Sequence, residues 1–235
     1  MKKITLIALA ISALTVQQSF GQGQIVFANS ATAGSKIYTN TAASTSQGGT
    51  LISGAGSYTF ALFAYYTGSA STSTNSSTTP AASLSTTPWN NGSWELVGYA
   101  TNSATVGRII AEDGGAGYLA VPNLGSGYYA SMEIIGWNTA VGGSTVTSFN
   151  TAFNQALALS TGTASSLLFG YSNVGSLLLG NGTLPLNSNV LGGAAGNIGG
   201  FTLGTVIGTA PVPEPSTMAL AALGGASLLL FRRRK

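Results

Sequence analysis

The sequence predicts an all-β body, an antiparallel β-sandwich or jelly-roll-like fold with one short helix. Short apolar runs alternate with polar residues and are separated by turn residues, among 33 glycines in 235 residues. No fixed internal period is visible, which weighs against a regular solenoid. We expect this body to be flanked by an N-terminal signal helix and a C-terminal membrane helix.

The strongest predicted strand covers residues 57–66, where Tyr58, Phe60, Leu62 and Ala64 fall on one face. Other strands are expected at residues 24–29, 36–40, 94–100, 108–111, 117–122, 166–171, 177–179 and 201–207. Residues 67–88 are nearly all Ser, Thr, Ala, Gly, Asn and Pro. They offer too little apolar surface to bury, so we predict a flexible loop there.

Residues 128–137 form a second well-alternating strand. One face would carry Tyr128, Ala130, Met132 and Ile134, and the other Tyr129, Ser131, Glu133 and Ile135. The polar members of the second set predict that this face meets water.

One helix is predicted near residues 148–159. Ser148 is a suitable N-cap residue for it. The helical spacing then places five apolar residues on one face: Phe149, Ala152, Phe153, Ala156 and Leu157.

The N-terminus has the pattern of an export signal. Met1-Lys2-Lys3 is a basic start, and residues 4–16 form an apolar stretch too short for a membrane span. Ser19 and Gly21 are small residues that suit signal peptidase, so cleavage is expected before Gln22. The predicted domains are a signal peptide at 1–21, a body at 22–211 and a C-terminal sorting segment at 212–235.

The sorting segment has three parts. The first is an extended peptide, because proline disfavours helix in the residue before it, and it reads Val212, Pro213, Glu214, Pro215 and Ser216. Residues 217–231 carry no charge and would span about 22 Å as a helix, somewhat less than a bilayer core. The chain then ends in a basic stop expected to stay cytoplasmic: Arg232, Arg233, Arg234 and Lys235.

This order of parts resembles the PEP-CTERM sorting signal. That signal consists of a Pro-Glu-Pro box, here Pro213-Glu214-Pro215, then an apolar helix and an Arg-rich end. The same kind of segment is also labelled an ice-binding protein C-terminal domain. The resemblance implies that an exosortase, a transpeptidase-like membrane enzyme of exopolysaccharide-producing Gram-negative-type bacteria, cuts near the box.

The start of the body is similar to short exported PEP-CTERM proteins of Verrucomicrobia-like bacteria, in a Gln-Gly-x-x-x-Phe-x-Asn pattern at Gln22–Asn29. From both ends of the chain we expect an exported protein that is transiently membrane-anchored and then reaches the cell surface or extracellular matrix. Its expected partners are signal peptidase and the general export machinery, an exosortase-type enzyme, the membrane and, as a further candidate, exopolysaccharide.

Charge and composition exclude several classes of function. The basic residues lie mostly in the two sorting segments, and the body has only Lys36 and Arg108 against four acidic residues. A body charge of −2 gives no basic stripe for phosphates, so no nucleic-acid binding is expected. The chain has no Cys and no His, which rules out disulfides, thiol or histidine catalysis and a His/Cys metal site.

Two acidic groupings are the remaining candidates for chemistry. Glu112-Asp113 before two glycines is either half of a Ca²⁺ loop or an acidic turn, and we favour the turn. Glu95 and Glu133 are either a glycosidase-like carboxylate pair or surface charges on strands, and we favour surface charges. No catalytic residue, metal site or cofactor is therefore predicted.

The body is predicted to be structural or adhesive and not an enzyme. The alternative is a carbohydrate- or ice-binding module exported by the same route. Its sugar-stacking residues would be exposed aromatic side chains: Trp89, Trp94, Tyr99, Tyr128 and Tyr129.

The exported protein should begin at Gln22. Signal peptidase needs small residues one and three positions before its cut, and Gly21 and Ser19 supply them. Intact-mass measurement and N-terminal sequencing of the exported protein check this. Exported material that still carries Met1 would contradict it.

Overall fold

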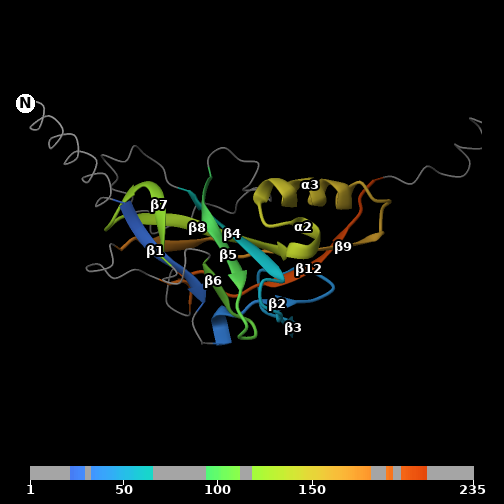
Figure 1. Ribbon diagram of the computed structural model, residues 1–235, viewed down its shortest axis with the longest axis horizontal. Helices are drawn as coiled ribbons and strands as arrows, with labels where there is room; N and C mark the ends of the chain where they lie inside the picture. The colour runs from blue at the N-terminus through green and yellow to red at the C-terminus, as the bar shows by residue number, and fades with distance from the viewer. Residues whose placement is uncertain are drawn as a thin grey trace, which may run out of the picture.

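Twelve strands of the computed structural model form one mixed sheet (Figure 1). The structure describes residues 22–29, 33–65, 94–111, 118–180, 189–192 and 197–210. In chain order the elements are β1 (Gln22–Asn29), η1 (Ala33–Ser35), β2 (Tyr38–Thr39), β3 (Thr50–Leu51), β4 (Tyr58–Tyr65), β5 (Glu95–Asn102), β6 (Ile109–Ala111), β7 (Tyr118–Gly125), β8 (Tyr129–Asn138), α2 (Thr139–Gly142), α3 (Val146–Leu157), β9 (Ala164–Tyr171), β10 (Gly175–Leu178), β11 (Asn189–Leu191) and β12 (Thr202–Ile207).

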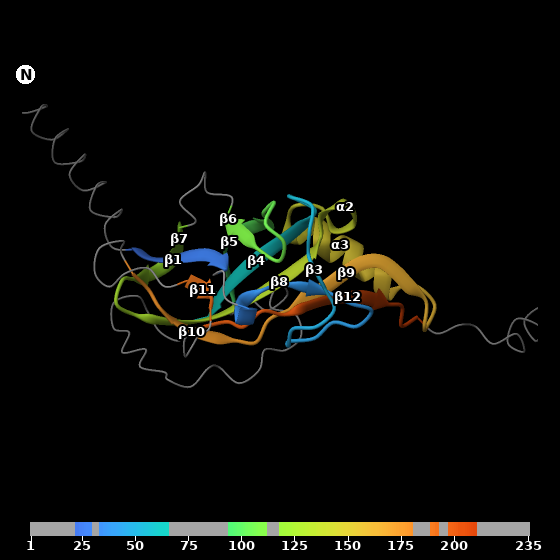
Figure 2. The same cartoon turned by 90° about the horizontal axis from the view of Figure 1, so that it is seen from below.

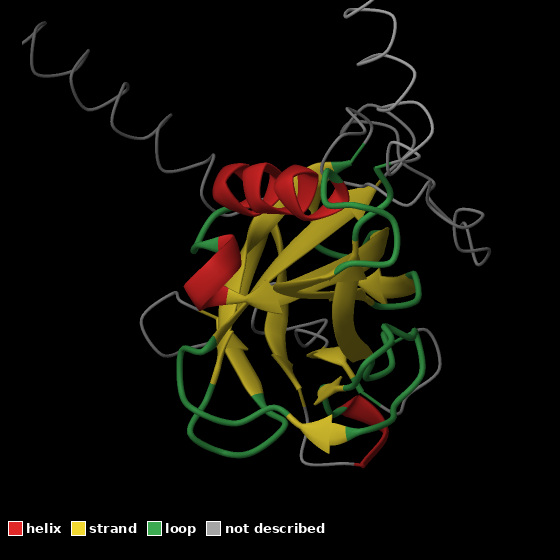
Figure 3. Cartoon of the chain, turned by 90° about the vertical axis from the view of Figure 1, so that its right-hand side faces the viewer, coloured by secondary structure: helices red, strands yellow, loops and turns green. Residues whose placement is uncertain are grey.

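The sheet order is β11-β1-β6-β5-β4-β8-β9-β12-β2-β3, with β10 on β8 and β7 on β1. Most pairs are antiparallel, whereas β1–β11 and β12–β2 are parallel. The prediction of an all-β body with one short helix is confirmed, and the strands form a single curled sheet (Figures 2 and 3). The expected signal and membrane helices lie outside the described residues.

An inner core fills the curl of the sheet. Its largest side chains include Phe27, Phe60 and Phe201, which are fully buried. These residues come from β1, from β4 and from the position just before β12; the three strands are separated in the sheet order, so the sheet must curve to bring them together. The predicted face of β4 is confirmed, because Phe60, Leu62 and Ala64 belong to this core.

An outer core lies on the opposite face, between the sheet and α3 (Figure 3). Trp137 of β8 stacks on Phe149 of α3 with ring centroids 4.6 Å apart, and Phe149 stacks on Phe169 of β9 at 5.2 Å. The Trp137 ring N–H donates to the Gly143 carbonyl at 2.7 Å, which also ties down the α2–α3 turn. The predicted apolar face of α3 is confirmed, because all five of its residues belong to or pack on this core.

The helix starts earlier than the sequence predicts. Thr145, not Ser148, is the N-cap, and its hydroxyl accepts the Ser148 backbone N–H at 3.2 Å. Ser148 returns the interaction by accepting the Thr145 N–H, which completes a capping box. Ser148 therefore does take part in capping, but from inside the first turn.

Two strands, β3 and β11, were not predicted, and β2 is shorter than expected. They contain two or three residues each, and alternation cannot be recognised over so short a length. β2 and β3 pair with each other, and β2 and β11 also pair with strands far away in the sequence, such as Tyr38 opposite Thr202.

Asn29, at the end of the Gln22–Asn29 pattern, joins two segments to β1: η1 and the turn between β5 and β6. The buried Asn29 amide donates to the carbonyls of Ser35 and Gly107 at 3.0 and 2.7 Å, and its oxygen accepts the Ile109 N–H at 2.9 Å. All three bonds are buried, so the Asn29 side chain satisfies backbone groups that are shielded from water. Asn102 likewise binds the loop before β4: its side-chain oxygen accepts the Tyr58 N–H at 2.8 Å, and its amide donates to the Gly54 carbonyl at 2.6 Å.

Replacing Phe149 by Ala should destabilise the protein by about 3–5 kcal/mol, because it empties the centre of the outer core. Urea unfolding followed by circular dichroism measures this. The matched control is Val106→Ala, at a side chain that is 45% exposed, which should cost about 0.5 kcal/mol or less. Equal losses of unfolding free energy in the two variants would contradict the assignment of Phe149 to the centre of the outer core.

Candidate functional site

The chain leaves the described body along a strand-like segment, residues 208–210, which we call the exit segment. The Thr209 and Ala210 N–H groups donate to the carbonyls of Leu157 and Leu159 at 2.9 and 3.0 Å. The Ala210 carbonyl accepts both the backbone N–H and the hydroxyl of Thr161, each at 2.8 Å. The chain is thus fixed to the body up to Ala210.

Gly208 allows the exit segment to lie directly against the backbone of Leu159. Any Cβ at this position would overlap the Leu159 backbone, so only glycine allows the two segments to touch. Its N–H donates to the Thr163 carbonyl at 2.8 Å, and its own carbonyl accepts the Gly162 N–H at 3.1 Å. Residues 157–163, which we call the α3–β9 corner, therefore hold the exit segment with hydrogen bonds on several consecutive residues.

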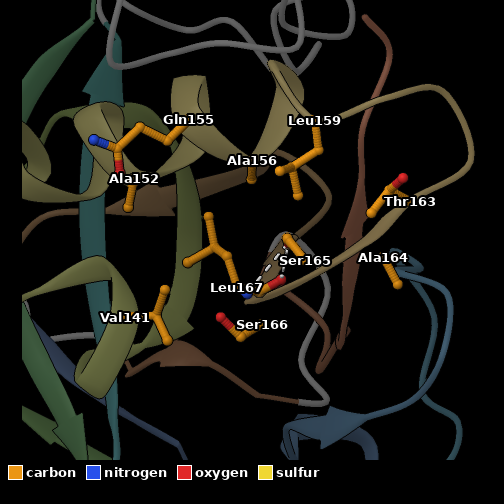
Figure 4. A pocket seen from close by; sticks show the side chains of 10 residues that line it. All are labelled: Val141, Ala152, Gln155, Ala156, Leu159, Thr163, Ala164, Ser165, Ser166 and Leu167. Carbon is orange, nitrogen blue, oxygen red and sulfur yellow. Dashed lines mark hydrogen bonds between the residues drawn. The ribbon is translucent and has the colours of Figure 1, made fainter. Parts of the chain in front are cut away.

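A hollow of about 420 Å³ lies beside this corner (Figure 4). Its floor is apolar, with Leu167 at the centre and Ala156 of α3 above it. Hydroxyl and amide groups of Gln155, Thr163 and Ser166 add polar positions. No charged residue lines the hollow, and Leu159 and Thr163 belong both to its lining and to the corner.

Glu133 is not at the surface, contrary to the sequence prediction. It is 3% exposed, and its Oε2 has no hydrogen-bond partner. Except for Tyr129 at its start, the second face of β8 is buried, because α3 and the outer core cover Ile135 and Trp137 on the same face. The presence of these two large apolar residues in the sequence indicated that this face is buried.

The surroundings of Glu133 explain why the pKa of its carboxyl group is raised. Phe63 is its partner on β4, and on the other side the β8 ladder is interrupted between β9 and β10. There the Ser172 hydroxyl, in place of a backbone carbonyl, accepts the Ile134 N–H at 3.0 Å. Burial raises the pKa of the Glu133 carboxyl from 4.5 to about 8, so at neutral pH it is mostly a neutral acid.

Glu95 and Glu133 cannot act as a carboxylate pair. Glu95 is the partner of Ala64, which belongs to the inner core, whereas Glu133 is the partner of Phe63, which belongs to the outer core. Cross-strand partners point to the same side of a sheet. The two carboxyl groups therefore lie on opposite faces, and neither lines the hollow.

Most of the aromatic residues considered for sugar stacking are used in packing. Trp94 is 8% exposed and stacks on Tyr65 at 5.3 Å, and Tyr128 packs against the inner core. The Tyr99 hydroxyl accepts the N–H of Val146, the first residue of α3, at 3.0 Å. Tyr129 remains exposed, at 44%. Trp89 lies outside the described residues.

Other predicted positions are also outside the described part of the chain. These are Glu112-Asp113, Ser19 and Gly21, loop 67–88, and the sorting segment 212–235. Gln22, the expected mature N-terminus, is the first residue of β1. Within the described residues no helix is long and apolar enough to span a membrane, and no group of three acidic ligands gathers.

Sequence comparison identifies the segment that follows the exit segment. Residues 211–235 match the PEP-CTERM protein-sorting motif. The match begins directly after Ala210, where the described body ends, and it contains the whole predicted sorting segment. The PEP-CTERM motif is a substrate signal for exosortase, a membrane enzyme, and implies an exported, envelope-directed protein.

Neither a curated protein nor a solved structure matches the chain. The match at residues 211–235 confirms the resemblance to PEP-CTERM proteins for the sorting motif. The Verrucomicrobia-like origin and the ice-binding label stay predictions.

Stability should fall as pH rises from about 4.5 to about 8, and Glu133→Gln should remove that fall. The folded state holds the Glu133 proton more tightly than the unfolded state, so ionisation favours unfolding, at a cost of up to roughly 5 kcal/mol. Urea unfolding of both proteins at pH 4, 6, 7.5 and 9 measures it. We expect similar stabilities at pH 4 and a clearly more stable variant at pH 9. If the stability of the two proteins changes with pH in the same way, folding does not raise the pKa of Glu133.

Proposed function

We propose that this chain is an exported cell-surface or extracellular-matrix protein, cut and released at its Pro213-Glu214-Pro215 box by an exosortase-type enzyme. The observation that supports this most directly is the motif match at residues 211–235, which starts where the fixed body ends. The body is then cargo for the sorting route, with a structural or adhesive role.

The sorting segment suits this role part by part. The prolines of the box disfavour helix in the residues before them, so the sequence favours a peptide that an enzyme can read. The uncharged residues 217–231 partition into the bilayer, and the basic end is held at the cytoplasmic face. The box is thereby kept at the outer surface of the membrane until it is cut.

The packing of the body supports a non-enzymatic role. The chain has no His or Cys, and the two strand carboxyl groups lie on opposite faces of the sheet. A carbohydrate- or ice-binding module is less well supported, because Trp94, Tyr99 and Tyr128 take part in packing or internal hydrogen bonding.

Glu214→Ala should leave export intact but cause uncut protein to accumulate in the membrane, because the peptide read by the enzyme is damaged while the anchor is kept. Fractionation with a C-terminal tag and intact-mass measurement test this. Glu112→Ala, which removes a carboxylate elsewhere in the chain, is the matched control and should be cut like the wild type. If Glu214→Ala is also cut like the wild type, the box is not a sorting signal.

Neutral residues in place of Arg232, Arg233, Arg234 and Lys235 should have a different effect. Without the basic stop the tail is no longer held at the inner face, so protein should leak outward with its tail attached. The same tagged fractionation distinguishes the two defects. Wild-type processing in this variant would show that the basic end does not hold the tail.

A further inference from the structure

The distance from the fixed body to the box is short. Ala210 is the last described residue and is bonded to the α3–β9 corner, and Glu214 follows four residues later. Four residues span at most about 14 Å even when fully extended. The centre of the box therefore stays within about 14 Å of Ala210, whatever the conformation of the residues between them.

An enzyme reading the box must then meet the body. A single helix with its side chains is already about 10–12 Å wide. A membrane enzyme that encloses the box would bring its outer surface against the residues around Ala210. The alternative, peeling the exit segment off the body, would break the hydrogen bonds of Thr209 and Ala210.

The surface around Ala210 is suited to such a contact. The corner and the hollow contain no charged residue, so no ionic group loses its water on docking. Leu159 and Val141 at the hollow are 37% and 40% exposed, which leaves apolar surface available. The hollow is open and shallow with a mostly apolar lining, and its volume is within the size range of binding pockets, so an apolar side chain can pack into it.

We propose that the α3–β9 corner and its hollow are the docking surface of the body for the exosortase-type enzyme, with an apolar side chain of the enzyme entering the hollow. This inference rests on the proposed function and adds a second point of recognition to it. The box is then presented at a fixed distance and orientation from a surface that the enzyme also contacts. The absence of basic residues at the corner disfavours anionic lipid headgroups as the occupant.

The decisive variant is Leu159→Glu in the full-length protein, expressed in cells that contain the sorting enzyme. A charge placed in the apolar contact should slow removal of a C-terminal tag by about tenfold, the equivalent of about 1.4 kcal/mol. Val106→Glu is the matched control, because its side chain is 45% exposed on the β5–β6 turn, and it should be cut at the wild-type rate. Protease resistance of the body in isolated membranes verifies that both variants are folded.

A linker separates docking from damage to the body. Twelve Gly/Ser residues inserted between Ala210 and Pro211 add an average reach of about 20 Å, which frees the box from the corner. Cleavage of Leu159→Glu should then return to the rate of the linker-containing wild type. A defect that persists with the linker, or equal cleavage of Leu159→Glu and Val106→Glu, would overturn the docking proposal.

Two further arms identify the source of any defect. If Glu214→Ala is cut normally, the sorting proposal itself fails; if Glu214→Ala stays uncut while Leu159→Glu is cut normally, only the docking proposal fails. In cells lacking the enzyme, Leu159→Glu and Val106→Glu should be retained equally in the membrane. Selective release of Leu159→Glu there would identify lipid as the occupant and overturn the assignment to the enzyme.

Discussion

The fold depends on the β4–β8 pair being largely apolar on both faces. Eight consecutive residues of β4, from Tyr58 to Tyr65, are in register with β8. On one face Phe60 and Ile134 enter the inner core, and on the other Phe63 and Ile135 enter the outer core. A strand pair of this kind has to be covered on both sides, which requires the curl of the sheet on one side and α3 on the other.

The same requirement explains the buried acid. Glu133 lies on the outer face of β8, between positions that α3 and the neighbouring strands cover, so it is removed from water together with its apolar neighbours. Its raised pKa follows from desolvation, since its Oε2 has no hydrogen-bond donor. A neutral acid is much less costly to bury than a carboxylate, and the body correspondingly carries less negative charge near pH 7 than its composition suggests.

The placement of α3 also decides how the chain leaves the body. The end of α3 and the turn after it supply the carbonyls that bind Thr209 and Ala210, and Gly208 lets the two segments touch. The described chain begins with β1 and ends just after β12, toward opposite ends of the long axis (Figure 1). The sorting motif thus follows directly after a segment that is hydrogen-bonded to the body, and it begins close to the α3–β9 corner.

The sequence alone determined what depends on local order. It was enough for the sorting motif, whose parts follow one another within 25 residues, for the alternation of β4 and for the apolar face of α3. Only the tertiary structure decided that Glu133 is buried, that Glu95 faces the other way, that Asn29 joins η1 and the β5–β6 turn to β1, and that residues 208–210 are fixed to the α3–β9 corner. Each of these depends on residues far apart in the chain, as with Asn29 and Gly107, and local sequence patterns carry no information about which distant segment will cover a face or meet an amide.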